Sequence, residues 1–276
     1  MEFLILTDIH DSWIHIEKMI RLAEEMDGVI FLGDLMTFRK FTQVSIDNFT
    51  KLKERSNWMV SIPGNGPVAK VLEFLDDLGI NLHGKGKRIE DIGFFGVGGV
   101  QETLTTISEI REFFRTEDTS TIEPDNLSLE TLNAFGITHD DRRFIVEEWS
   151  ESEFSALDVY KSPFELSEKL IFEVLSTALA QIKDAPLKIL LSHVPPFEPG
   201  IISASSIGVS TGSKSIARFI HDNLVDLAIS GHYHKHHEFQ IENTKCVVVP
   251  AVINGFYGVL SSNTSMKELR TEIRKF

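Results

Sequence analysis

Residues 3–10 read FLILTDIH, so four apolar residues and a threonine run directly into Asp8, and His10 follows two positions later. An uninterrupted apolar run of this length is typical of a strand buried on both faces, as in the parallel sheets of α/β proteins. The run is too short for a signal peptide or a membrane span, and no basic residue precedes it. We therefore expect a core strand that ends in a polar turn, in a protein without a membrane anchor.

The same arrangement of strand and turn recurs downstream. Apolar runs and helical patterns alternate over the first hundred residues, at 13–26 (helix), 29–32 (strand), 44–55 (helix), 58–62 (strand) and 68–78 (helix). This alternation predicts an α/β layer architecture, in which ligands bind beyond the carboxyl ends of the strands. The two further strands end in Gly33-Asp34 and in PGNG at 63–66, so polar turns would collect at one edge.

The second half of the chain adds strands after a change of pattern. A strand within 89–99 precedes an acidic stretch, and β-like runs follow at 188–191, 227–230, 237–241 and 245–249. Between them, Ser162, Pro163 and Glu165 form the start signals of a helix, including a capping box. A stripe at helical spacing supports this helix: Leu166, Leu170, Val174, Ala178 and Ile182.

The acidic stretch at 101–162 holds most of the charge of the chain. Residues 101–165 contain 16 Asp and Glu against 5 Lys and Arg, and they carry −11 of the formal net charge of −14. A solvated acidic linker is the simpler explanation, but Phe113, Phe135, Phe144 and Trp149 count against it. We expect a helical cap inserted into a single domain that spans residues 1–276. This cap is a candidate surface for a protein partner or for self-association.

Five expected strand ends carry side chains that can bind a metal. These side chains are Asp8 with His10, Asp34, Asn65, His193, and His232 with His234. Residues two apart on an extended chain point the same way, so each pair can reach one ion. Singly, each motif has an ordinary explanation, because aspartates cap helices, Gly-Asp and Gly-Asn-Gly form turns, and a lone histidine is often structural. The metal site is indicated by the set as a whole.

In this order, the five motifs resemble those of the calcineurin-like metallophosphoesterase superfamily. The resemblance runs from residue 2 to about residue 249 apart from the acidic stretch, and IPGN at 62–65 and GSK at 212–214 also look like that family. It implies a four-layer α-β-β-α sandwich, here with the inserted helical cap. The loop at 212–214 leads into a helix whose backbone N–H groups could face an anion, or it is an ordinary helix start.

The resemblance also implies a dinuclear metal centre. One ion would be held by Asp8, His10 and His234, the other by Asn65, His193 and His232, and Asp34 would bridge them. Carboxylate, amide and imidazole ligands suit Mn²⁺, Fe or Zn²⁺ more than Ca²⁺. Two such ions would clamp a phosphoryl group, and a hydroxide that bridges them would attack phosphorus. The implied activity is therefore hydrolysis of phosphate esters, with phosphodiesters favoured over monoesters.

One position departs from the family pattern. Many members carry a histidine directly after the asparagine of the Gly-Asn motif, and here Gly66 takes that position. General acid–base help of this kind is worth about 10²–10⁴-fold where it operates. Asp11, His139 and His236 are candidate substitutes, and spacing favours none of them. Without a substitute, activated aryl esters should react much faster than alkyl esters.

Two other classes of function stay open. A catalytically weak or inactive scaffold that contains metal and binds a protein partner would account for Gly66, although such a scaffold has no need for a full ligand set. Metal storage or a structural zinc would account for the histidines, although structural zinc sites usually use thiolates. Loss of Mn²⁺-dependent turnover on Asp34→Ala would identify an enzyme.

Composition narrows the partners and the compartment. The net charge of −14, without a visible basic stripe, disfavours strong nucleic-acid binding and favours a small phosphate ester as the substrate. Cys246 is the only cysteine, so no disulfide can form within the chain. A reducing, cytoplasmic location is therefore expected.

Overall fold

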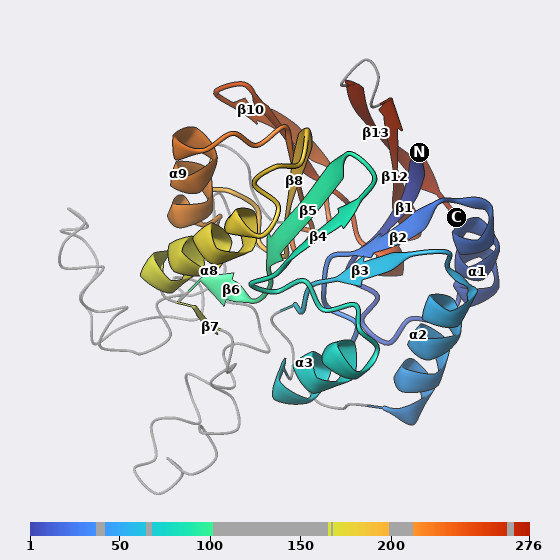
Figure 1. Ribbon diagram of the computed structural model, residues 1–276. Coiled ribbons are helices and arrows are strands. Elements are labelled where there is room, and N and C mark those ends of the chain that lie inside the picture. Colours follow the sequence, from blue (N-terminus) through green and yellow to red (C-terminus); the bar gives the residue numbers. More distant parts are fainter. Residues whose placement is uncertain (37–41, 65–67, 102–164, 167, 199–211, 264–267) are drawn as a thin grey trace, which may run out of the picture.

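The computed structural model describes residues 1–36, 42–64, 68–101, 165–166, 168–198, 212–263 and 268–276. Within these ranges the chain forms two large β-sheets with helices on their outer faces (Figure 1). The expected α-β-β-α layering is confirmed. No helix in the described ranges combines the length and the apolar character needed to cross a membrane.

The first sheet has the strand order β13-β12-β1-β2-β3. Its parallel part consists of β1 (Glu2–Leu6), β2 (Gly28–Phe31) and β3 (Met59–Ser61). Two antiparallel strands extend it beyond β1, namely β12 (Phe256–Asn263) and β13 (Glu268–Lys275). The helices that follow the parallel strands are α1 (Ile16–Glu25), α2 (Gln43–Arg55) and α3 (Val68–Asp77), and they lie on the right and at the bottom of Figure 1. The alternation expected from the first hundred residues is therefore present, whereas β12 and β13 are not anticipated by the sequence patterns.

The second sheet has the order β10-β11-β9-β8-β5-β4. Its parallel strands are β5 (Ile92–Val97), β8 (Leu187–Ser192), β9 (Leu227–Ser230) and β11 (Thr244–Val248). Antiparallel edge strands flank them, namely β4 (Gly86–Ile89) and β10 (His237–Ile241). The outer face is covered by α8 (Glu168–Ala180) and α9 (Lys214–Asp222), on the left of Figure 1.

Three clusters of buried apolar side chains stabilise the fold, and strand β1 contributes to two of them. Phe3 and Ile5 belong to the cluster between the two sheets, whereas Leu4 and Leu6 belong to the cluster beneath the helices of the first sheet. A third cluster packs α8 and α9 against the second sheet. Because β1 is buried on both faces, it reads as an uninterrupted apolar run.

The helix after the acidic stretch begins later than the sequence predicts. Glu165–Leu166 form the short strand β7, which pairs in parallel with β6 (Val100–Gln101), and α8 begins only at Glu168. The buried face of α8 accordingly includes Ile171 and Leu175, while Leu170 is 43% exposed. The capping-box interpretation was wrong because it used local signals alone, and pairing with a distant strand overrides them.

Strands β6 and β7 also flank the acidic stretch, so the chain leaves and re-enters the described fold at adjacent positions. Apart from Gln101, the expected helical cap at 101–162 lies outside the described residues. The insertion and the single-domain boundary therefore stay predictions.

Candidate metal centre

Six of the seven expected ligands lie where strand ends of the two sheets meet. Asp8 and His10 follow β1, and Asp34 follows β2, all from the first sheet. His193 follows β8, and His232 with His234 follows β9, from the second sheet. The seventh, Asn65, lies outside the described residues.

The turns that carry the ligands have unusual backbone conformations. Eight non-glycine residues in the described ranges have φ in the left-handed region, and five of these are candidate ligands: Asp8 (54°), His10 (49°), Asp34 (54°), His232 (67°) and His234 (55°). This region is sterically disfavoured for residues with a Cβ, and such strain is concentrated at functional sites. The extended chain expected for the two histidine-bearing pairs is therefore wrong. Left-handed turns, not strand alternation, direct these side chains.

Glycines allow the turns to approach one another closely. A Cβ on Gly64 would collide with the carboxylate of Asp34, and a Cβ on Gly231 would collide with the hydroxyl of Thr7. The backbone N–H of Gly231 also donates to the carbonyl of His193 at 3.0 Å. Larger residues at these positions would push the ligand turns apart.

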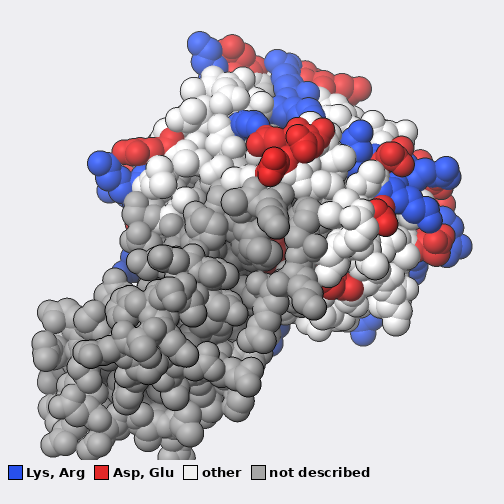
Figure 2. Space-filling view, turned by 90° about the horizontal axis from the view of Figure 1, so that it is seen from below, with Lys and Arg blue, Asp and Glu red and all other residues white. Residues whose placement is uncertain are grey.

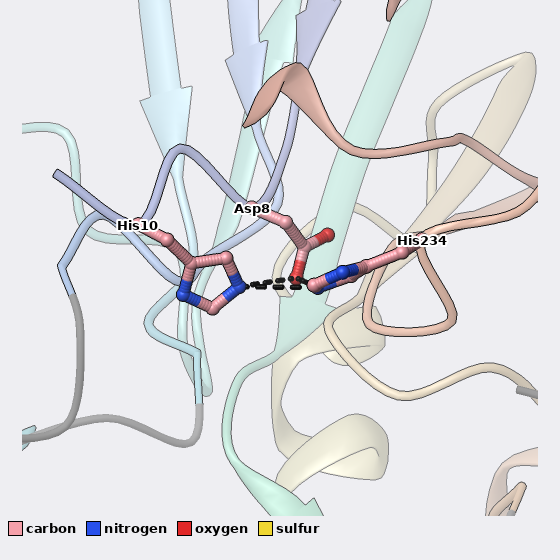
Figure 3. Close-up of side chains that lie close together, drawn as sticks. All are labelled: Asp8, His10 and His234. Carbon is pink, nitrogen blue, oxygen red and sulfur yellow. Dashed lines mark hydrogen bonds and ion pairs between the residues drawn. The ribbon is translucent and has the colours of Figure 1, made fainter. Parts of the chain in front are cut away.

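Three of the ligands form a first group, which consists of Asp8, His10 and His234 (Figure 3). The Nε2 atoms of the two imidazoles are 3.1 Å apart. The Asp8 Oδ1 atom lies 3.3 Å from His234 Nε2 and 3.7 Å from His10 Nε2. The side chain of Asp8 is fully buried, whereas those of His10 and His234 are 13% and 31% exposed.

The other three form a second group, which consists of Asp34, His193 and His232. His193 Nε2 lies 3.2 Å from His232 Nδ1 and 3.4 Å from Asp34 Oδ2. The same Oδ2 atom lies 3.8 Å from His10 Nε2, so Asp34 stands between the two groups. Asp34 and His193 are both buried.

These separations fit shared cations. Two ligand atoms that are each about 2.1 Å from one ion, in tetrahedral or octahedral geometry, lie roughly 3.0–3.4 Å apart. The four shortest contacts named above, from 3.1 to 3.4 Å, fall within that interval. The donor atoms of each group can therefore converge on a single ion.

Asp8 uses its two carboxylate oxygens differently. Oδ2 accepts hydrogen bonds from the Thr7 hydroxyl at 2.6 Å and from the backbone N–H of His232 at 3.0 Å. Oδ1 is buried and has no hydrogen-bond partner among the described residues. A buried carboxylate oxygen that accepts no hydrogen bond is costly, and a cation would satisfy it.

The site favours positive charge. Burial alone would raise the pKa of the Asp8 carboxyl, but contacts with His10 and His234 outweigh burial and hold this pKa well below its ordinary value. Burial would likewise lower the pKa of His193, yet the adjacent carboxylate of Asp34 raises it to about 9. Burial also lowers the pKa of His232, with help from the charge on His193, to about 4. Two ionised, desolvated carboxylates thus hold positive charge in the site, as a proton on His193 when no cation is bound, which is an environment suited to metal ions.

Two of the three candidate substitutes for the missing histidine are engaged elsewhere. Asp11 Oδ1 accepts hydrogen bonds from the hydroxyls of Thr42 and Ser45 at the start of α2. His236 Nδ1 donates to the carbonyl of Val248 at 3.1 Å. The third, His139, and the position of Gly66 lie outside the described residues.

The loop at 212–214 leads into α9, and the anionic group that faces it is a side chain of the protein itself. The carboxylate of Glu168 accepts from the backbone N–H groups of Lys214 at 3.0 Å and Ser215 at 2.8 Å, and from the Ser213 hydroxyl at 2.7 Å. The Ser213 side chain in turn accepts from the N–H of Ile216. These donors are satisfied within the protein, so the ordinary helix start is the better explanation.

Thr7 is a functional candidate that the sequence patterns do not provide. Its hydroxyl donates to the candidate ligand Asp8 without being a candidate ligand itself, and threonine is common at strand ends, so composition and spacing give no signal. A hydroxyl residue directly before the aspartate is the only cue that the sequence contains.

Comparison with known proteins adds independent information. The sequence profile of calcineurin-like phosphoesterases matches residues 1–236. An uncharacterized protein of Methanocaldococcus jannaschii, MJ1162, is 30% identical over 106 residues. This match covers 37% of the present chain and only 45% of the length of that protein.

Solved structures with the same fold cover nearly the whole chain. TT1561 of Thermus thermophilus superposes with a TM-score of 0.63 at 16% identity, over 98% of this chain and 97% of that one. A dimetal phosphatase from Danio rerio gives a TM-score of 0.58 at 13% identity, over 99% and 96% of the two chains. Phosphopantetheinyl hydrolase from Mycobacterium tuberculosis gives 0.51 at 12% identity, over 90% and 89%. At these identities the likeness establishes a shared fold.

Proposed function

This chain belongs to the calcineurin-like phosphoesterase family, and from that membership we propose that it hydrolyses phosphate esters with two bound divalent cations. The observation that carries the proposal is the convergence of two carboxylates and four imidazoles from separate strand ends. Their spacing suits two ions, and the buried Oδ1 atom of Asp8 needs a positive partner.

We assign the ligands as follows. The first group would hold one ion, the second group together with Asn65 would hold the other, and Asp34 would contact both. The 3.8 Å separation between Asp34 Oδ2 and His10 Nε2 supports the bridging role. When bound, the two cations would polarise a phosphoryl oxygen and lower the pKa of a water molecule. The set lacks thiolates, which favours Mn²⁺, Fe or Zn²⁺ in an open site over a structural zinc.

Local hydrogen bonds prepare the imidazoles for this task. The carbonyl of Leu32 can only accept, so His193 Nδ1 carries a proton and donates to it at 2.8 Å. This bond leaves His193 Nε2 to face Asp34 and the second group. A fixed tautomer of this kind is what metal-binding histidines require from their surroundings.

The substrate we place first is a phosphodiester with a good leaving group. A diester carries one negative charge, so a chain with a net charge of −14 repels it less than the dianion of a monoester. Asp11 and His236 are tied to other partners, and Gly66 cannot donate a proton. Leaving groups that need no proton should therefore be preferred.

A long nucleic acid fits less well. On the face seen in Figure 2, the described Lys and Arg side chains are interspersed with Asp and Glu. Such a mixed surface offers little counterion release to a polyanion, so a small ester is the better candidate. Because Cys246 is a buried free thiol and the only cysteine, we place the protein in the cytoplasm.

A metal analysis combined with an ester panel tests the proposal. The purified protein would be loaded with Mn²⁺, and turnover would be compared on aryl diesters, aryl monoesters and alkyl esters. We expect two ions per chain, loss of turnover on Asp34→Ala, and aryl rates above alkyl rates by about 10²-fold or more. Two bound ions without turnover on any ester would support the metal-containing scaffold instead.

A further inference from the structure

The arrangement around Asp8 raises the question of what fixes the direction of its carboxylate. The backbone of Asp8 is held at both ends of its turn, because its N–H donates to Gly33 at 3.0 Å and its carbonyl accepts from Ile253 at 3.2 Å. These bonds fix the Cα atom but leave rotation about the Cβ–Cγ bond. Such a torsion between tetrahedral and planar carbon has a broad, shallow energy profile. Something else must therefore fix the orientation of the carboxylate plane, so that one oxygen faces the first group.

The side-chain contacts of Asp8 fix this orientation. Oδ2 takes two donors, the Thr7 hydroxyl and the His232 N–H, and the opposite oxygen is thereby turned toward His10 and His234. The hydroxyl contact is the shorter of the two, at 2.6 Å, and it involves an ionised acceptor. Hydrogen bonds to ionised groups are about twice as strong as neutral ones.

Thr7 is itself held rigidly. It is fully buried, and its carbonyl accepts from Val252, in the 3-10 helix η2 (Val252–Asn254), at 2.9 Å. The hydroxyl also packs closely against Gly231, and a Cβ at that position would collide with it. The hydroxyl therefore sits in a position for which the turn of the second sheet makes room.

We propose that Thr7 is the positioning residue that orients Asp8 and thereby sets the affinity of the ion held by the first group. The inference rests on the proposed function, because it takes the first group as an ion site. Changes to residues that orient metal ligands typically cost about 10–100-fold in affinity. The effect should be confined to one of the two ions, because His193 depends on Leu32 for its orientation and not on Thr7.

The test is a titration of metal-free protein with Mn²⁺, followed by calorimetry and by electron paramagnetic resonance. Thr7→Val keeps the shape and removes the hydroxyl, Thr7→Ala also removes it, and Thr7→Ser keeps it. We expect Val and Ala to weaken one of two ions by about 10–100-fold, and Ser to stay within about threefold of the wild type. The resonance spectrum should then change from that of coupled ions to that of single ions in the first two variants alone.

Thr244→Val is the matched control. Thr244 is also buried, and its hydroxyl donates to the carbonyl of Val225 at 2.6 Å, on β11 in the second sheet. This variant should lose stability comparably while binding both ions as the wild type does. Equal affinities in the wild type and in Thr7→Val or Thr7→Ala would overturn the inference alone. Wild-type protein that binds no Mn²⁺ would overturn the proposed function, and the inference with it.

Discussion

The two ligand groups use the same kinds of side chain, yet the fold holds them differently. In the first group only Asp8 is buried, and the imidazoles of His10 and His234 remain partly exposed. In the second group Asp34 and His193 are both buried. His193 is moreover fixed by a backbone carbonyl at the end of a strand of the other sheet. In the second group, two of three ligand candidates thus lie in the packed core and His232 is partly exposed, whereas in the first group only one of three is buried and the group stands at the rim.

Because of this difference, substitutions in the two groups should change folding stability and ion affinity to different degrees. Buried polar groups are costly when they lose a partner, so a change in the second group should disturb folding as well as binding. A partly exposed ligand can turn to water instead. Changes at the rim should therefore affect ion affinity at little cost to the fold.

The largest effect is expected where the groups meet, at Asp34. Asp34→Asn removes the charge at nearly constant shape, and both ions lose a ligand. We expect kcat to fall by about 10³-fold or more, because the ions stabilise charge that develops in the transition state. Steady-state kinetics with elemental analysis would measure this. Asp77→Asn, an exposed carboxylate on α3, is the control and should change neither quantity. Wild-type turnover with two ions in Asp34→Asn would show that the groups do not share this residue.

A pair of histidine variants compares the core with the rim directly. His193→Gln removes the imidazole that lies 3.4 Å from the buried carboxylate of Asp34 and so breaks a buried charge pair, which should destabilise the metal-free protein by about 3–5 kcal/mol. His234→Gln alters a side chain that is 31% exposed. Substitutions at such positions usually change stability by only about 0.5 kcal/mol. Denaturant unfolding in the presence of a chelator measures both, and equal losses would erase the distinction between the groups.

The candidate ligands could be selected from the sequence because each motif is local and its chemistry is distinctive. Asp8, Asp34 and His193 each follow an apolar run, and parallel strands bring such ends together. Their conformations could not be predicted in the same way. The left-handed φ at Asp8 and at His232 depends on glycines and carbonyls contributed by other turns.

The sequence predictions that fail elsewhere do so because strands pair with segments far away in the chain. The predicted helix start at Ser162 used sound local signals, yet Glu165–Leu166 pair with Val100–Gln101, and no local pattern contains that partner. Strand β13 reads ELRTEIRK, with charged residues throughout, and it is a strand because β12 lies beside it. Thr7 was missed for a related reason, since its role is visible only when the acceptor is known.

The pH dependence of stability should distinguish the two imidazoles of the second group. The pKa of His193 is raised to about 9, so its contribution is full below its ordinary pKa of 6.5 and is lost as pH rises through 9. The pKa of His232 is lowered to about 4, so its contribution is full above 6.5 and is lost as pH falls toward 4. The metal-free protein should therefore be most stable near pH 6.5, with losses of about 1–3 kcal/mol toward either side.

Unfolding in chelator across roughly pH 5 to pH 9 would measure this curve. His193→Gln should flatten the alkaline side and also reduce the loss on the acid side, because the charge on His193 helps to lower the pKa of His232. His221→Gln is a control on an exposed histidine of α9. Asp222 and Glu242 raise the pKa of His221, so this variant should remove only a small part of the alkaline loss and leave the acid side in place. A curve without a maximum in this range would contradict the proposed charge pairing between Asp34 and His193.

The smallest expected effect is kinetic and concerns the order in which the ions leave. An ion bound by a partly exposed ligand can exchange that ligand for water or chelator one step at a time, so the ion of the first group should leave first. We expect release in two phases that differ by about tenfold or more, since local opening is easier at a rim than in a core. Stopped-flow mixing of the Mn²⁺-loaded protein with a chelator would resolve them. Thr7→Val should accelerate only the fast phase, because its hydroxyl supports Asp8 and not His193. A single phase for both ions would mean that the burial of the ligands does not govern the rate of ion release. The contrast between core and rim would then apply to the packing of the side chains and not to ion exchange.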